Sequence, residues 1–168
     1  MLLLFAAVRP SWAIEGTAYQ IKGAMMMNFI KFIEWPAPAG EPSEAMDTLT
    51  IGIVGARGFD SILNKIHGRQ IGEKKLIIRR IHFLNQLSGC QVLYIGASDS
   101  YRSYDILKQV AGNPVLTIGE DEDFIRLGGI IRLYNENDHI RFEINQSAAD
   151  HAGLKLSAKL LEVAAGVH

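Results

Sequence analysis

The strongest apolar pattern along the chain lies between Thr17 and Pro36. At helical spacing, large apolar side chains occupy nearly every turn of this stretch, and the polar residues leave only a narrow stripe. A helix with this pattern is buried on most of its circumference or is partly covered by another molecule. Thr17 suits the N-cap position, and Pro36 ends the pattern because it disfavours helical backbone at Trp35. We therefore predict a core helix over 17–36. In the alternative interpretation, its three methionines at 25–27 offer an adaptable surface to a partner.

Downstream of this helix, short apolar runs alternate with helical patterns. Runs rich in β-branched residues and bounded by turn residues predict strands at 49–54, 76–83, 91–95 and 115–118. Helical spacing predicts helices at 59–66, 99–110, 121–127 and 157–164, and a helix that Asn145 or Ser147 caps and that ends near Gly153. The segment 135–138 has turn chemistry between two further strands, at 130–134 and 139–144.

This alternation predicts an α/β fold with a mostly parallel sheet, helices on both faces and a C-terminal antiparallel hairpin. The glycine-rich turn at 52–58 lies between a strand and a helix, where dinucleotide sites occur. Its spacing is G-x-x-G-x-x-G, and no acidic residue ends a second strand about 20 residues further on. The prediction is therefore a Rossmann-like fold without a nucleotide site, in which the glycines serve a tight turn.

The first residues have the pattern of a targeting segment. An apolar run at 2–8 precedes Ser11-Trp12-Ala13, a small-x-small cleavage pattern. This is typical of the back half of a secretory signal peptide whose basic n-region is missing. We expect residues 1–13 to be the remnant of that peptide and residues 14–168 to form a single exported domain.

Composition and charge exclude few classes of function. The 168 residues are 48% hydrophobic and 21% charged, and the net charge of −1 gives no reason to expect nucleic acid as a partner. The charge is uneven, however. Residues 57–82 hold seven Lys or Arg against two Asp or Glu, whereas residues 119–151 hold three against eight. Such a split can orient a partner or close a dimer, although two solvated faces produce it more often.

No pattern of reactive side chains predicts an enzyme. The serines lie in no G-x-S-x-G motif, and the five histidines form neither H-E-x-x-H nor any other known catalytic spacing. The acidic run at 120–123 lacks the ligand spacing of a calcium loop. Cys90 is the only cysteine, which leaves a buried thiol or an intermolecular disulfide, and the apolar run that follows it favours a buried thiol at the start of a strand. We therefore expect no metal, no cofactor and no catalysis, which favours a binding or regulatory protein.

Six sequence blocks, taken in order, carry a resemblance to a known family. They are 19–36 with its N-F-x-K-F-x-E-W-P ending, 49–55, 66–81, 89–96, 128–133 and 141–161. Over about 150 residues they resemble the YfiR-like periplasmic regulators. The resemblance implies a periplasmic α/β domain that forms a homodimer and represses an inner-membrane diguanylate cyclase by binding its periplasmic part. It also implies an OmpA-like outer-membrane lipoprotein as a second partner, and control of cyclic-di-GMP and biofilm formation as the output.

The chain departs from the type member of that family in its cysteines. Cys90 matches a family cysteine, but the pair that the resemblance implies between Ile125 and Arg132 is absent, which argues against redox control through disulfides. The candidate partner-binding residues come from the apolar helix, the basic strand and the C-terminal hairpin–helix region: Met26, Phe29, Ile30, Trp35, Arg79, Arg80, Arg141, Leu154 and Leu156.

An alternative function is a periplasmic small-ligand-binding domain that serves a sensor or a transporter. It follows from the fold class, because α/β sheets bind ligands at the carboxyl ends of their strands. In this chain those ends are expected near Gly55, Gly96 and Gly119.

Overall fold

The computed structural model describes the backbone of residues 11–36 and 47–168, and the side chains of these ranges from residue 18 onward. The predicted signal-peptide segment at 1–13 lies outside the residues whose side chains are described. The helices of the described chain are α1 (Ser11–Lys31), α2 (Asp60–Ile66), α3 (Ser103–Val110), α4 (Gln146–His151) and α5 (Ala158–Val163). Its strands are β1 (Ile33–Glu34), β2 (Thr48–Val54), β3 (Gln70–Ile71), β4 (Lys74–Arg80), β5 (Val92–Ile95), β6 (Leu116–Gly119), β7 (Ile131–Glu136), β8 (His139–Ile144), β9 (Lys155–Leu156) and β10 (Gly166–Val167).

Eight of these strands form one mixed sheet in the order β10-β8-β7-β6-β5-β2-β4-β3. The pairs β2–β4, β2–β5, β5–β6 and β6–β7 are parallel, so the predicted mostly parallel sheet is confirmed. The strands β7 and β8 form the predicted antiparallel hairpin, whose turn residues Asn137 and Asp138 have the positive φ angles that such a turn requires. The strands β1 and β9 form a separate antiparallel pair.

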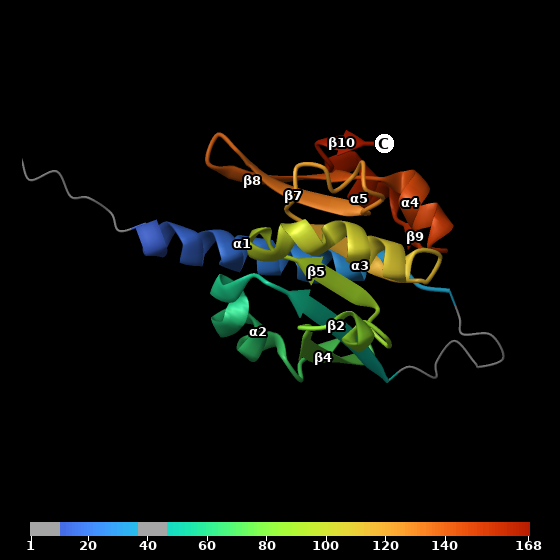
Figure 1. The fold of residues 1–168 in the computed structure, drawn as a ribbon, viewed down its shortest axis with the longest axis horizontal. Coiled ribbons are helices and arrows are strands. Elements are labelled where there is room, and N and C mark those ends of the chain that lie inside the picture. Colours follow the sequence, from blue (N-terminus) through green and yellow to red (C-terminus); the bar gives the residue numbers. More distant parts are fainter. Residues whose placement is uncertain (1–10, 37–46) are drawn as a thin grey trace, which may run out of the picture.

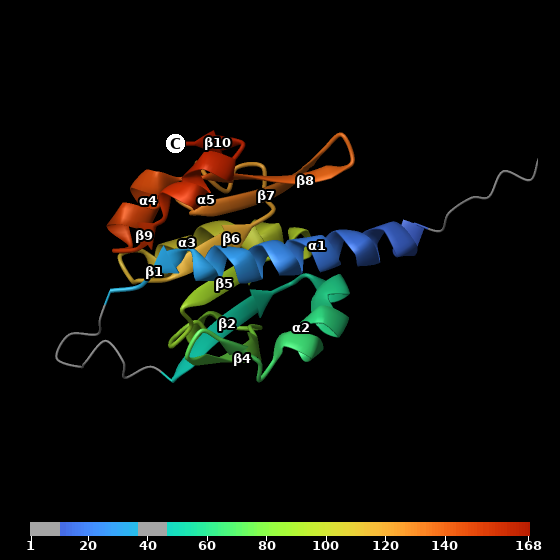
Figure 2. The same cartoon turned by 180° about the vertical axis from the view of Figure 1, so that it is seen from behind.

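Helices cover both faces of the sheet. In Figures 1 and 2, α1 crosses one face and α3 lies on the other. Alternate residues of β5 consequently belong to two hydrophobic cores. Tyr94 packs in the core that contains Phe29 of α1, whereas Leu93 packs in the core that contains Ile106 of α3. Because β2 and β5 lie between other strands and under helices on both faces, they are continuous apolar runs rather than alternating ones.

The first predicted helix differs from the structure at both ends. The helix α1 already includes Ser11, so Thr17 lies inside it and is not its N-cap. At the other end α1 stops at Lys31, and Ile33 and Glu34 pair with β9. The local sequence has a helical pattern at Ile33 and Glu34, but these residues form a strand because β9, more than 120 residues further along the chain, pairs with them.

The predicted acidic helix at 121–127 was wrong, because this segment is a series of turns. The side chain of Asp121 accepts a hydrogen bond from the backbone N–H of Asp123 at 3.0 Å, which favours a turn over a helix. The ring of Phe124 is fully buried against Gly119 and Gly129, where a Cβ atom would collide with it. The insertion of this ring between two glycines fixes the segment in its non-helical path.

Candidate functional site

Four of the predicted partner-binding residues lie in the interior of the molecule. Met26, Phe29 and Ile30 of α1 are at most 5% exposed, and Leu154 is 1% exposed. All four belong to the core under α1. A side chain in that position cannot contact another protein while the fold is intact, so the prediction of a contact surface on this face of α1 is corrected here. The interpretation of 17–36 as a core helix is the one that the structure supports.

Two other predicted residues lie at one corner of the molecule, where β1 pairs with β9. Trp35 follows β1, and its indole Nε1–H donates a hydrogen bond to the carbonyl oxygen of Gln91 at 3.3 Å. Leu156 of β9 is paired with Ile33. Both side chains are half-buried, and neighbouring Phe32 is 38% exposed. Phe32, Trp35 and Leu156, which we call the β1/β9 corner, thus combine exposed apolar surface with a fixed backbone.

The three predicted arginines lie on two separated strands. Arg79 and Arg80 are at the carboxyl end of β4, and Arg141 is on β8, with β7, β6, β5 and β2 between them in the sheet. The guanidinium of Arg79 donates to the carbonyl of Ser88 at 2.8 Å, and Arg141 forms an ion pair with Glu136 at 2.8 Å. The structure therefore does not bring the predicted residues together into one surface.

A buried polar cluster that the sequence did not reveal connects α1 to the centre of the sheet. The Nζ atom of Lys22 lies 2.5 Å from Oε2 of Glu120, and the side chains of both residues are 8% exposed. The hydroxyl of Tyr94 donates to the other carboxylate oxygen of Glu120 at 2.6 Å. Burial, followed by the neighbouring Glu120 charge, raises the pKa of Tyr94 well above its ordinary value. Every group in this cluster is paired, as groups taken out of water must be.

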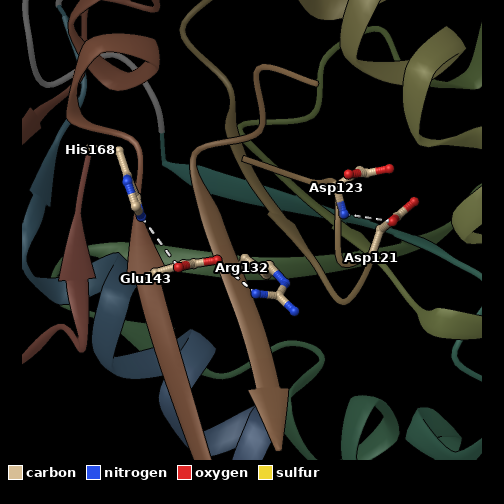
Figure 3. A network of polar contacts seen from close by, with 5 residues as sticks. All are labelled: Asp121, Asp123, Arg132, Glu143 and His168. Atoms are coloured by element: carbon tan, nitrogen blue, oxygen red, sulfur yellow. Dashed lines mark hydrogen bonds and ion pairs between the residues drawn. The ribbon is translucent and has the colours of Figure 1, made fainter. Parts of the chain in front are cut away.

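A second polar network lies on the C-terminal hairpin, closer to solvent (Figure 3). Arg132 of β7 donates to Oε1 of Glu143 on the neighbouring strand β8 at 2.8 Å, and Nε2 of His168 is 3.3 Å from Oε2 of the same carboxylate. Burial alone would raise the pKa of Glu143, but the hydrogen bonds from Arg132 and His168 outweigh it and lower the pKa. Figure 3 also draws the separate hydrogen bond within the turn that contains Asp121 and Asp123.

The lone cysteine and the acidic groups give no sign of redox or metal chemistry. Cys90 is 5% exposed and is a free thiol, and burial raises its pKa despite the nearby Arg79. Thiolate, the reactive form, is therefore disfavoured. Within the described ranges, no group of three or more His, Cys, Asp or Glu side chains is arranged to hold a metal ion. Among the helices that the structure describes, none has the length and apolarity needed to cross a membrane.

Solved structures of other proteins share this mixed α/β architecture. A conserved domain protein from Vibrio cholerae O1 biovar El Tor matches with a TM-score of 0.51 and 11% identity, over 92% of this chain and 60% of its own length. The ABC domain from Streptococcus pneumonia, solved in complex with L-Trp, matches with a TM-score of 0.52 and 9% identity, over 71% of this chain and 55% of its own. The chain thus corresponds to between half and two thirds of each of these proteins, and the likeness shows the fold alone.

The protein is a mixed α/β domain. In the described residues, its buried and half-buried charged side chains form ion pairs that stabilise the fold. A family model described as DUF4154, YfiR/HmsC-like, matches residues 19–165. Because this match covers most of the chain, the protein belongs to the YfiR/HmsC-like family, and the resemblance noted in the sequence is confirmed. The family is one of periplasmic regulators of cyclic-di-GMP signalling.

Proposed function

We propose that this chain represses an inner-membrane diguanylate cyclase by binding its periplasmic part, and thereby lowers cyclic-di-GMP. Membership of the YfiR/HmsC-like family is the single observation that carries the proposal. In this proposal the chain is exported to the periplasm and acts as a homodimer. An OmpA-like outer-membrane lipoprotein is a second partner that competes for it.

The proposed contact surface is the β1/β9 corner. Trp35 and Leu156 are half-buried there, and Phe32, which directly precedes β1 and whose carbonyl accepts a hydrogen bond from Ser157, is 38% exposed. Apolar side chains that are held on paired backbone and partly open to water are the kind of anchor that contributes most to protein–protein binding. The basic end of β4, with Arg79 and Arg80, is a second candidate contact for an acidic partner surface.

The test is a gene deletion with matched complementation, read out as cellular cyclic-di-GMP. We expect the deletion to raise cyclic-di-GMP, and the wild-type chain to restore the lower level. Phe32→Glu should fail to restore it, because a charge at this corner opposes apolar contact. Tyr101→Glu is the matched control, since Tyr101 is a 79% exposed aromatic residue that follows the carboxyl end of β5, whereas Trp35 of the corner contacts Gln91 before the start of β5.

Two results would contradict the proposal at different levels. Unchanged cyclic-di-GMP in the deletion strain would exclude repression of a cyclase. Full complementation by Phe32→Glu would leave repression intact but move the contact away from the β1/β9 corner. Co-purification of the cyclase with the wild-type chain from solubilised membranes, lost with Phe32→Glu, would show that the effect is direct.

A second candidate function, a periplasmic small-ligand-binding domain that serves a sensor or a transporter, is favoured by one comparison. The pneumococcal protein of similar fold was solved with a bound amino acid. Ligand binding and partner binding are compatible on one domain, because α/β sheets bind ligands at one end and leave their other surfaces free.

A further inference from the structure

We propose that a small anion with a phosphate or carboxylate group binds in a polar cavity at the carboxyl ends of β2, β4 and β5. The cavity has a volume of about 380 Å³. Three arginines line it, each from the segment that ends or follows a different strand: Arg57 after β2, Arg80 at the end of β4 and Arg102 after β5. The proposal concerns binding only and does not depend on repression of a cyclase.

The topology of the sheet favours a ligand at this place. The chain leaves β2 toward α2, which contacts α1 on one face, and leaves β5 toward α3 on the opposite face. The adjacent strands β2 and β5 therefore flank the point where the connections diverge. In open α/β sheets, ligands bind outside the carboxyl ends of the strands beside such a point.

The arginines are unequally used by the protein itself. Arg80 donates from Nη1 to the carbonyl of Gly55 at 3.0 Å and forms an ion pair with Asp60, so the fold already employs it. Arg102 donates one hydrogen bond, to the carbonyl of His82 at 3.0 Å. Arg57 has no hydrogen bond or ion pair with any residue in the described part of the chain. Because a guanidinium carries five N–H donors, Arg57 and Arg102 retain most of their donors for a ligand.

The charges that line the cavity select an anion. The acidic residues in its wall are Asp60, which pairs with Arg80, and Asp99, which accepts a hydrogen bond from Ser98 at 3.3 Å. The wall thus contains three guanidinium groups and two carboxylates, and its net charge is positive even when His82 is counted as neutral. Guanidinium groups match phosphate and carboxylate oxygens in pairs, which makes these groups the chemistry that the cavity would recognise.

The backbone at the cavity mouth has an unusual conformation that other contacts maintain. Gly55 and Ala56 both have positive φ angles, of 65° and 56°, although alanine rarely adopts this region. The N–H of Ala56 donates to the hydroxyl of Ser98 at 3.2 Å, and a Cβ at Gly96 would collide with Ala56. Two consecutive left-handed residues turn the chain sharply after β2 and place Arg57 on the cavity wall. Strained backbone of this kind concentrates at binding sites.

The experiment titrates the purified chain with inorganic phosphate and, separately, with succinate and citrate, at constant ionic strength set with sodium chloride. Isothermal titration calorimetry and the shift in Tm report binding. We expect saturable binding of phosphate, of the carboxylates, or of both. Loss of one charged hydrogen-bonding group should weaken that binding about tenfold in Arg57→Gln and in Arg102→Gln. Arg69→Gln is the matched control, because Arg69 is exposed and lies outside the cavity.

Each outcome decides the proposal. Binding of phosphate alone assigns the site to a phosphorylated ligand, and binding of the carboxylates alone assigns it to an organic acid. The absence of saturable binding for all three probes would overturn the proposal, as would binding that Arg57→Gln and Arg69→Gln affect equally. Arg57 has no partner in the described fold, so an unchanged Tm of the ligand-free Arg57→Gln variant shows that any lost binding is not a folding defect.

Discussion

Two polar clusters of this protein use the same chemistry at different depths. In the buried cluster, Lys22 and Glu120 are each 8% exposed, and the hydroxyl of Tyr94 completes the carboxylate's hydrogen bonds. In the hairpin network, Arg132 and Glu143 are 18% and 20% exposed, and the third member, a C-terminal histidine, is 52% exposed. The buried pair Lys22–Glu120 connects α1 to the sheet across 98 positions of sequence, whereas the pair Arg132–Glu143 joins the neighbouring strands β7 and β8.

The difference bears on how the protein can bind partners. Because the buried cluster and the core under α1 hold this helix against the sheet, an unlocked α1 would break the Lys22–Glu120 pair and expose the apolar core residues beneath it to water. Exposing several core side chains costs several kcal/mol. Docking on the outer surface, at the β1/β9 corner, requires no such step. The comparison therefore favours contacts on the folded surface over exposure of the apolar side of α1.

The largest effect should come from Lys22→Met, which removes one charge of the buried pair. Glu120 would then be buried without its counter-ion, and we expect a loss of about 3–5 kcal/mol in the free energy of unfolding. Urea denaturation at pH 7 measures it. The double variant Lys22→Met/Glu120→Gln is the control, because it removes both charges and keeps an acceptor for Tyr94. It should recover most of the loss, and a double variant as unstable as the single one would show that the charge is not the cause.

Tyr94→Phe should have the second largest effect. It removes a hydrogen bond to a charged acceptor but leaves the ion pair, so we expect a loss of about 1.5–3 kcal/mol. The pKa of Tyr94 is raised in the folded state, so its contribution is complete below about pH 10, the ordinary tyrosine value, and is lost as the pH rises further. Stability of the wild type should thus fall steeply above pH 10, and the fall should be smaller in Tyr94→Phe. Equal alkaline slopes in both proteins would refute this role.

Most of the fold could be predicted from local patterns. The apolar runs that became β2, β5 and β6 are continuous because helices cover both faces, and the turn at Asn137 and Asp138 needs the φ angles that those residue types tolerate. Local sequence patterns gave wrong secondary structure where contacts with distant segments determine the conformation of the backbone. The strand β1 exists because β9 pairs with it, and the segment around Phe124 is non-helical because the ring is buried against two glycines.

The candidate sites were harder to predict for the same reason. Lys22 and Glu120 look like ordinary surface charges in the sequence, and only the packing of α1 over the end of β6 brings them together. A weak signal existed, since Lys22 lies in a stretch that is otherwise almost entirely apolar. The apolar pattern of α1 marked residues such as Phe29 as important but could not distinguish a core contact from a partner contact, because both bury the same surface.

The hairpin network should give a smaller effect than the buried cluster. For Glu143→Gln we expect a loss of about 0.5–1 kcal/mol at pH 7, because partly exposed ion pairs are screened by water. The pKa of Glu143 is lowered in the folded state, so its contribution is present above about pH 4.3, the ordinary glutamate value, and disappears as the pH falls below it. Unfolding measured from pH 7 down to pH 3 should show the two proteins converging. A difference that persists at pH 3 would point to packing rather than charge.

Changing the salt concentration should give the smallest effect, but it distinguishes the buried Lys22–Glu120 pair from the more exposed Arg132–Glu143 pair most clearly. Raising the ionic strength from 0.1 M to 1 M shortens the screening length from about 10 Å to about 3 Å, which weakens exposed pairs far more than buried ones. The stability difference between the wild type and Glu143→Gln should therefore shrink by a few tenths of a kcal/mol. The difference between the wild type and Lys22→Met should stay unchanged, because solvent ions do not reach Glu120 while α1 covers it. If both differences shrank in parallel, α1 would be opening to solvent in the native state, and the exclusion of its apolar side as a contact surface would no longer hold.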